Sequence, residues 1–489
     1  MRPTYDHPLA GTWSAPGGPW GDDPLDGILV GAPALEERVA TVAGGLLAAG
    51  VEPGQTVAWQ RPNGLDAIAL YRAAWRVGAV AAPLHHLAGP AEVSALLSRL
   101  DPAVFVGPGD GVPAGRPAPR GAVEVDPAGV AVALATAGST GVPKLALHTH
   151  RGLAYKARLM ARTHQLGADD CFLLAPPLAH ISGLLNGVLV TVGGMRAVPM
   201  ARWEPGAALE LVEREQVSFM VGPPAFFVAL LGVPGFATER VRSLRQVSCG
   251  GAGVTPAFVR SASAALECRV KRSYGSTEAP TVTTSTLDDD LDRAATTDGC
   301  PVGHAELRVV DTVDAIDAID AIEAIDAAPG LGDVAPGATG EIWVRGPEVC
   351  AGYDDPAATE AAFTTDGWFR TGDLGAVDPD GWLTVVGRFK DVIIRGGENI
   401  AASEVEGVLE AHPAVRQAAV VGYPDPRLGE RVCAFVEADP AFDLHECQAW
   451  FAARGITKFK WPERVEVVEA LPLLPAGKPD RAALRASLA

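Results

Sequence analysis

A stretch rich in glycine and hydroxyl side chains is the first segment of this sequence whose residue types and spacing suit chemistry. Residues 136–144 read TAGSTGVPK and follow directly on an apolar run, 130–134, that predicts a β-strand. Glycines let a loop turn several backbone N–H groups toward one anion, and hydroxyl groups and Lys144 add donors. The stretch is not a GxxxxGK[ST] loop, because no serine or threonine follows the lysine. Many such turns are plain loops, but the preceding strand and the terminal lysine favour binding of a polyphosphate.

A second polar group combines glycines with one acid. Residues 273–278 read SYGSTE, and residues 248–253 before them read SCGGAG. The glycines leave room for a flat ring beside the chain, and the carboxylate of Glu278 could hold Mg²⁺ against phosphates. Taken alone, Glu278 is more simply a surface carboxylate and the glycines a turn.

A third group places an acid and an arginine at the ends of two predicted strands. Residues 367–373 read GWFRTGD, and after a strand-like run residues 387–391 read GRFKD. An aspartate at a strand end, here Asp373, can accept hydrogen bonds from two ribose hydroxyls, while Arg388 can bind the same sugar and a phosphate. Each segment by itself is a turn with an ordinary charge, so their meaning comes from the combination.

In order and spacing, these groups resemble the adenylate-forming superfamily of acyl- and aryl-CoA synthetases, peptide-synthetase adenylation domains and beetle luciferases. The resemblance is greatest to the acyl-CoA synthetases and covers nearly the whole chain. Further motifs that carry it are at 340–342 (GEI), 352–353 (GY), 396–399 (GGEN), 424–425 (PD), 429–430 (GE) and 474–478 (LPAGK).

The resemblance implies two half-reactions and a set of ATP-binding residues. A carboxylate attacks the α-phosphate of ATP to give an acyl-adenylate and pyrophosphate, and coenzyme A then displaces AMP to give a thioester. The resemblance assigns Glu278 to Mg²⁺. By motif, the other nucleotide positions are Ser139, Thr140 and Lys144 for pyrophosphate, Gly251, Ala252 and Tyr274 for adenine, Thr277 for the α-phosphate, and Asp373 and Arg388 for ribose.

The resemblance also assigns roles near the carboxyl end and beside the acyl group. Lys478 matches the lysine that bridges the attacking carboxylate and the α-phosphate, where a positive charge is needed because two anions approach each other. Lys390 matches the hinge about which a carboxyl-terminal domain rotates. In the rotated state the 396–399 loop, with Gly396 and Gly397, would border the pantetheine tunnel. His180 matches a position beside the carboxylate pocket, although a lone histidine in an apolar stretch is equally well a packed core residue.

Two departures and several alternatives stay open. Ala137 stands where serine is more usual and Leu145 where glycine is usual, and the lost hydroxyl costs about 1 kcal/mol, or about 3 if charge-assisted. The alternatives are an acyl-AMP ligase that loads an acyl carrier protein, a member with weakened adenylation that mainly performs the thioester step, and a non-catalytic nucleotide-binding or scaffold protein. The small and apolar residues expected around the acyl pocket, at His180, Gly183, 223–226 and 250–253, suit an uncharged aliphatic, alicyclic or aryl acid.

The elements that must position these residues form an α/β protein of more than one domain. Helix-spaced apolar residues alternate with short apolar strands through the first part of the chain, which predicts parallel sheets with crossover helices. We expect a large amino-terminal domain of parallel α/β sheets over residues 1–387, with a β-rich subdomain at about 305–387. A small, mobile α+β domain is expected over 388–489.

Composition sets the outer limits. The chain has 489 residues, is 48% hydrophobic and carries a formal net charge of −19, which argues against a nucleic-acid surface and against binding to anionic lipid. Its 7 cysteines are dispersed without a CxxC pair, as in a reduced cytoplasmic protein, and no run is long enough for a membrane span. The repeat 314–326, DAIDAIDAIEAID, is an expanded low-complexity loop or, less simply, a docking element for a basic partner.

Overall fold

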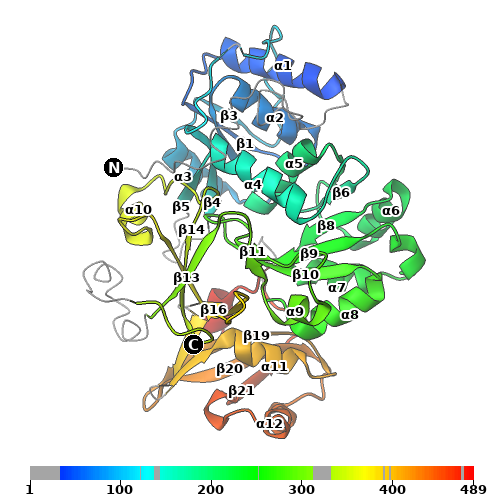
Figure 1. The fold of residues 1–489 in the computed structure, drawn as a ribbon, viewed down its shortest axis with the longest axis vertical. Coiled ribbons are helices and arrows are strands. Elements are labelled where there is room, and N and C mark those ends of the chain that lie inside the picture. Colours follow the sequence, from blue (N-terminus) through cyan, green and yellow to red (C-terminus); the bar gives the residue numbers. More distant parts are fainter. Residues whose placement is uncertain are drawn as a thin grey trace.

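The computed structural model describes residues 33–121, 123–136, 144–251, 253–311, 332–388, 391–395, 398–474 and 478–488. Within these residues the strands form four sheets, and Figure 1 shows three of them in the upper part of the molecule and the fourth, in orange to red, at the bottom. The repeat 314–326 lies outside the described residues, so both interpretations of it stay predictions.

The first sheet is formed by the amino-terminal part of the described chain. Its strands, in spatial order, are β3 (Val104–Val106), β1 (Thr56–Gln60), β2 (Val80–Leu84), β4 (Val130–Thr136) and β5 (Lys144–Thr149). The first four are parallel, whereas β5 returns antiparallel to β4. The intervening helices are α1 (Pro33–Ala48), α2 (Leu65–Arg76) and α3 (Pro90–Leu100).

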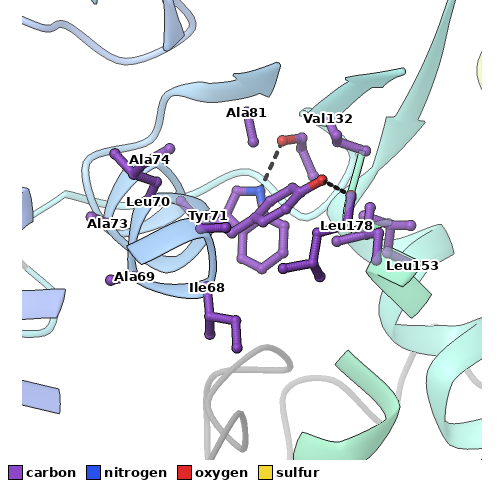
Figure 2. Close-up of a cluster of buried hydrophobic side chains, with 14 of the residues drawn as sticks. Ile68, Ala69, Leu70, Tyr71, Ala73, Ala74, Ala81, Val132, Leu153 and Leu178 are labelled. Carbon is purple, nitrogen blue, oxygen red and sulfur yellow. Dashed lines mark hydrogen bonds between the residues drawn. The ribbon is translucent and has the colours of Figure 1, made fainter. Parts of the chain in front are cut away.

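Helix α2 anchors the core between this sheet and the next. Its aromatic residues Tyr71 and Trp75 are almost completely buried, and each satisfies its polar atom inside the core. The Tyr71 hydroxyl donates to the Leu178 carbonyl at 2.6 Å, as Figure 2 shows, and the Trp75 indole N–H donates to the Ala131 carbonyl at 2.8 Å. Because a buried donor without a partner is costly, these two bonds fix α2 against two different segments.

The second sheet is the larger one and is mostly parallel. In spatial order its strands are β12 (Cys300–Pro301), β11 (Thr283–Thr284), β10 (Arg269–Tyr274), β9 (Gln246–Gly250), β8 (Phe219–Gly222), β6 (Cys171–Leu174) and β7 (Arg196–Pro199). Only the pairings of β11 with β10 and β12 are antiparallel. Its helices are α4 (His150–Thr163), α5 (Ile181–Gly193), α6 (Pro205–Glu215), α7 (Pro224–Leu231), α8 (Pro256–Leu266) and α9 (Leu291–Thr296), with a 3₁₀ turn at Thr238–Val241.

The third sheet is antiparallel throughout. Its strands, in order, are β13 (Glu306–Val310), β14 (Gly340–Arg345), β15 (Phe369–Val377) and β16 (Leu383–Arg388), and α10 (Pro356–Ala362) connects the middle pair. These strands lie in the predicted β-rich segment 305–387. Antiparallel pairing brings Asp373 and Arg388 opposite each other on adjacent strands.

The fourth sheet belongs to the carboxyl-terminal part of the chain. Its strands are β18 (Glu398–Ala401), β17 (Val392–Arg395), β20 (Gly429–Ala438) and β19 (Val415–Asp425) in order, and β21 (Arg464–Val467) also pairs with β20. Helices α11 (Ala402–Glu410), α12 (Leu444–Ala453) and α13 (Arg481–Ala486) and a 3₁₀ turn at Lys458–Lys460 complete this part. It encloses a hydrophobic core of its own, which includes Ile400, Leu409, Val436 and Phe451.

The predicted fold class is confirmed: mixed α/β sheets form a larger amino-terminal part and a smaller α+β carboxyl-terminal part. Among the described residues, every helix is too short or too polar to span a lipid bilayer. The cysteines Cys171, Cys249, Cys268, Cys300, Cys350, Cys433 and Cys447 are all free, and only Cys268 and Cys300 are partly exposed.

Candidate active site

The stems of the predicted phosphate loop form the end of a hairpin. Thr136, the last residue of β4, is paired with Lys144, the first residue of β5. Residues 137–143 lie outside the described residues, and with them Ser139 and Thr140. The register nevertheless fixes where the loop starts and ends, and it places Lys144 directly at the loop's exit.

Tyr353 links Lys144 to Glu278, the predicted metal-binding acid. The Lys144 ammonium lies 5.0 Å from the ring centroid of Tyr353, and the Tyr353 hydroxyl donates to Glu278 Oε1 at 2.7 Å. Burial and the negative charge of Glu278 raise the pKa of Tyr353, so its hydroxyl stays protonated as a donor. The 352–353 motif belongs to the resemblance, but its position in the sequence does not reveal this contact with Glu278.

The backbone of Thr277 and Glu278 is held by two further contacts. His148 Nε2 is 2.7 Å from the Thr277 carbonyl, and the Cys350 N–H donates to the Glu278 carbonyl at 2.8 Å. Burial lowers the pKa of His148 to about 4, so the ring is neutral near pH 7 and its Nε2–H is the donor. Strand β5, which contains His148, thereby fixes the loop that follows β10.

Asp373 is the centre of the predicted ribose site. Its carboxylate accepts from the Tyr274 hydroxyl at 2.9 Å and from Arg388 Nε at 2.7 Å. Burial raises the pKa of Asp373, and the charge of Arg388 acts in the opposite direction. The turn before it requires Gly372, which has φ +68°, and the Gly372 N–H donates to the buried Glu341 carboxylate at 3.1 Å.

Lys478 reaches this site from the carboxyl-terminal part. The Leu474 N–H donates to the Lys478 carbonyl at 2.7 Å, and the Asp480 N–H donates to the Pro472 carbonyl at 2.7 Å, which closes a short hairpin. Burial and the Arg388 charge lower the pKa of Lys478, while Asp373 and Glu278 raise it. Three predicted site residues outside the fourth sheet thus act electrostatically on one ammonium group.

His180 is the fourth group near this ammonium. It stands just before α5, and burial together with the Lys478 charge lowers its pKa to about 4. Gly183, expected at the acyl pocket, has a packing role as well, since a Cβ there would lie 2.0 Å from the Pro177 carbonyl oxygen. The turn before α5 therefore packs tightly, and His180 is held at its end.

Comparisons with known proteins decide the family. The model of the AMP-binding enzymes matches residues 33–354, and the model of their carboxyl-terminal domain matches residues 404–478. The chain belongs to the AMP-binding enzymes.

Relatives and structural neighbours agree with this assignment. A medium-chain fatty-acid–CoA ligase of Escherichia coli is 31% identical, over 92% of this chain and 84% of its own. A feruloyl-CoA synthase of Amycolatopsis is 35% identical, over 91% of both chains. The ATP-bound crystal structure of MatB from Rhodopseudomonas palustris superposes with a TM-score of 0.81 at 27% identity, covering 93% of this chain and 92% of the other. The predicted class, an AMP-forming acid–thiol ligase of the acyl-CoA synthetase kind, is confirmed.

In this AMP-binding enzyme the predicted residues divide into two sets. The structure brings together those for which side-chain placement is described, namely Lys144, Tyr274, Glu278, Asp373, Arg388, Lys478 and His180. Thr277 joins them through its carbonyl, and Gly251 follows β9 with φ +78°. Ala252, Lys390, Gly396 and Gly397 lie outside the described residues, so their roles stay predictions.

Proposed function

We propose that this enzyme activates a carboxylic acid with ATP as an acyl-adenylate and then transfers the acyl group to coenzyme A, releasing AMP. The observation that carries the proposal is the position of Lys478. Its ammonium is subject to the charges of Glu278, Asp373 and Arg388, and it acts on His180. Groups expected at the metal ion, the ribose and the acyl pocket therefore meet at one lysine from the other part of the chain.

In the first step, the described residues bind and orient two anions. Asp373 would accept from the ribose hydroxyls, held ready by the hydrogen bonds from Tyr274 and Arg388. The Lys478 ammonium would lie between the incoming carboxylate and the α-phosphate, where it offsets the charge that develops as the new bond forms. Lys144 would attract the leaving pyrophosphate, and the neutral His148 keeps the Thr277 backbone in place.

Mg²⁺ fits the donor set at Glu278. Glu278 Oε1 accepts from Tyr353, which leaves Oε2 available, and Mg²⁺ in nucleotide sites commonly takes one or two carboxylates with the phosphates. In the described part of the chain no three His, Cys, Asp or Glu side chains converge as a metal cage, so the nucleotide itself would supply ligands. When bound, the ion would neutralise phosphate charge.

The second step requires Lys478 to leave. We place the domain boundary at 387/388 and the hinge at Lys390, so that the fourth sheet turns as a unit and the 396–399 loop faces the site. The separate hydrophobic core of that part supports movement as a unit. The relatives named for medium-chain fatty acids and for ferulate support an aliphatic or aryl acid with coenzyme A as acceptor. The free cysteines support a cytoplasmic location. Transfer to an acyl carrier protein is the second candidate.

The test separates the two half-reactions. Pyrophosphate release is measured with a panel of acids, with and without coenzyme A, for the wild-type protein, Lys478→Ala and the control Lys458→Ala. Lys458 is an exposed lysine of the same part of the chain. We expect Lys478→Ala to lose adenylation by roughly 10²–10³-fold, in the range of removing one preorganised electrostatic group, and to retain thioester formation from a supplied acyl-adenylate. The Lys458→Ala variant should keep both steps.

Two outcomes would contradict the proposal. If no acid of the panel releases pyrophosphate, the ligase activity is wrong and the non-catalytic alternative stands. If Lys478→Ala adenylates at the normal rate, the role of Lys478 is wrong. Release of pyrophosphate without thioester formation would favour carrier loading over coenzyme A.

A further inference from the structure

Three histidine rings form a row beside the site. The rings of His85 and His86 are stacked with centroids 4.8 Å apart, and those of His85 and His180 are 5.2 Å apart and tilted by 44°. His85 and His86 directly follow β2, while His180 precedes α5. We call His86, His85 and His180 the imidazole row. It joins the end of the first sheet to a helix of the second.

Buried amide side chains hold the two ends of the row. The Gln60 side-chain amide, at the end of β1, donates to the carbonyls of His85, His86 and Ala88 at 3.2, 3.4 and 2.9 Å. The Asn63 side chain donates to the Pro176 carbonyl at 2.9 Å and accepts from the Leu178 N–H at 2.8 Å. Because Gln60 and Asn63 are both less than a tenth exposed, the backbone on each side of the row is fixed by protected contacts.

Some ring nitrogens of the imidazole row take part in no hydrogen bond among the described residues. The Leu87 N–H donates to His85 Nδ1 at 3.2 Å, so the proton of the neutral ring is on Nε2. Within the described residues, the Nε2 atoms of His85, His86 and His180 are shielded from solvent and make no hydrogen bond. Burial lowers the pKa of His85 and His180 to about 4 and that of His86 in the same direction, so the row is neutral near pH 7.

Two cationic side chains act electrostatically on the row. Lys478 acts on His180 and Arg202 acts on His86, and each lowers the pKa of its neighbour. Among the described residues, the ion pair of a histidine with a carboxylate is found at His412 and not in the row. Both cations and the His85 Nε2–H are complementary to oxygen acceptors, and none of them complements a donor or a cation.

The residue next to Arg202 in sequence contacts the predicted acyl pocket. Arg202 is followed by Trp203, whose ring stacks on Phe226 at 4.1 Å. Phe226 belongs to the stretch 223–226 expected to border that pocket. An acyl group with its carboxylate at Lys478 would therefore extend along the row toward Arg202.

We propose that the imidazole row is a specificity-determining element that selects carboxylic acids carrying a second oxygen acceptor, a carbonyl or a carboxylate, remote from the reacting carboxylate. The inference rests on the proposed function, because it assumes that the reacting carboxylate lies at Lys478. It changes the expected substrate from an uncharged apolar acid to an oxygen-bearing one. Two ring-to-ring distances, 5.2 and 4.8 Å, separate His180 from His86, which suits an acceptor several bonds away from the carboxylate.

The test uses three acids of equal chain length: heptanoate, 6-oxoheptanoate and heptanedioate. The kcat/KM for pyrophosphate release is measured for wild-type, His85→Phe, Arg202→Met and His412→Phe proteins. Phenylalanine keeps a flat ring and removes the N–H. We expect the wild-type protein to prefer an oxygen-bearing acid over heptanoate by about three- to tenfold, the range of one net hydrogen bond, and His85→Phe to abolish that ratio. Arg202→Met should reduce the ratio for heptanedioate alone.

His412→Phe is the matched control. His412 packs against Phe442 and Trp450 in the carboxyl-terminal part, between α11 and β19 and far from the row in sequence, so its variant should keep both the activity and the ratio. A proportional loss of activity toward all three acids in His85→Phe would leave the ratio unchanged and would count against the inference. An unchanged ratio in a His85→Phe protein overturns the inference.

A measurement without turnover separates this inference from the proposed function. Imidazole ¹⁵N spectra of [¹⁵N]histidine-labelled protein are recorded with α,β-methylene-ATP, which cannot release pyrophosphate, and each acid in turn. We expect the His85 Nε2 signal, identified by its loss in His85→Phe, to shift with 6-oxoheptanoate or heptanedioate and not with heptanoate. A shift in these spectra, combined with no pyrophosphate release from ATP in the activity assay, would refute the ligase function and support the row as a binding site. Pyrophosphate release at equal rates for all three acids, with no shift of the His85 Nε2 signal, would support the ligase function and refute the inference about the row.

Discussion

Asp373 and Lys478 reach one site by two different kinds of support. Asp373 lies in the third sheet, where strand register places it opposite Arg388 and where Tyr274 of the second sheet also binds its carboxylate. Lys478 lies in a hairpin closed by main-chain hydrogen bonds and tied to the fourth sheet through side chains. A group that must stay for both proposed steps is built into sheets, whereas the group that must leave is carried by a separate part. Substitutions around Asp373 and around Lys478 should therefore affect the two half-reactions differently.

Replacing Asp373 is the largest perturbation. Asp373→Asn keeps the volume but leaves the Arg388 charge without its partner, and it weakens the predicted ribose contact in both half-reactions. We expect adenylation and thioester formation from a supplied acyl-adenylate to fall together by roughly 10²-fold, near the upper end for loss of a hydrogen bond to a charged group. Rates of the two half-reactions measured separately check this. The exposed Asp366→Asn serves as the control, and a loss confined to one step would contradict the shared role.

The stability of the amino-terminal part and that of the carboxyl-terminal part should change with pH in opposite directions. Burial lowers the pKa of His148 to about 4 from 6.5, so the unfolded chain binds its proton first as the pH falls, and the contribution to stability is lost between pH 6.5 and 4. Burial raises the pKa of Glu410 on α11 to about 7 from 4.5, so the unfolded chain releases its proton first as the pH rises, and stability is lost from pH 4.5 to 7.

Because His148 is fully buried, its shifted pKa should lower the free energy of unfolding by about 3 kcal/mol at pH 4, at 1.36 kcal/mol per pKa unit. The effect of Glu410 should be smaller because its carboxyl is only partly shielded. Hydrogen exchange, corrected for intrinsic rates and compared between β5 and α11 at pH 5 and pH 7, measures both. His148→Gln and Glu410→Gln should flatten the profile of their own region only. Profiles of the same sign in both regions would refute the comparison.

Arg481 is expected to position Lys478. Its guanidinium donates to both Glu406 oxygens, at 2.7 and 2.9 Å, from the start of α13, just after the hairpin that contains Lys478. Arg481→Met should lower adenylation by about tenfold, because the ammonium loses its fixed position, and leave thioester formation from a supplied acyl-adenylate unchanged. Arg481→Lys should restore part of the rate, and Arg485→Met, which removes a half-exposed arginine of the same helix, should change little. Equal losses in both steps would indicate a merely structural role.

Tyr353→Phe should give the smallest effect. The variant removes the hydrogen bond to Glu278 and keeps the ring beside Lys144. We expect kcat/KM for ATP to fall by about three- to tenfold, the range for one typical net hydrogen bond. A Mg²⁺ titration of the initial rate should show a changed apparent affinity for the ion. An unchanged titration with a lowered rate would place Tyr353 outside the metal site.

Much of the site could be predicted because its motifs resemble those of a known family. Lys144 begins β5 and Arg388 ends β16, but Asp373, expected at a strand end, lies in the middle of β15, where it is the cross-strand partner of Arg388. The contacts of Tyr353 with Glu278, of His148 with Thr277 and of Arg481 with Glu406 could not be read from the sequence. Each joins segments 75 or more residues apart, and such contacts depend on which sheet faces which.

The imidazole row could be predicted from the sequence even less well than these contacts. His180 was a predicted site residue by its motif, yet His85 and His86 precede it by more than ninety positions and have no motif of their own. Their meeting depends on the parallel order of β1 and β2 and on the turn before α5. A pair of adjacent histidines directly after an apolar strand is the only sequence signal that points to them.

The protected thiols make this chain convenient for optical work. Burial raises the pKa of Cys171, Cys249, Cys268, Cys300, Cys350, Cys433 and Cys447 alike, so little reactive thiolate is present at neutral pH. Two new cysteines at exposed positions, Ser261→Cys on α8 and His445→Cys on α12, would then react selectively with maleimide dyes, and the native cysteines would not have to be replaced. Energy transfer between the two dyes would test the proposed rotation of the carboxyl-terminal part in single molecules during turnover.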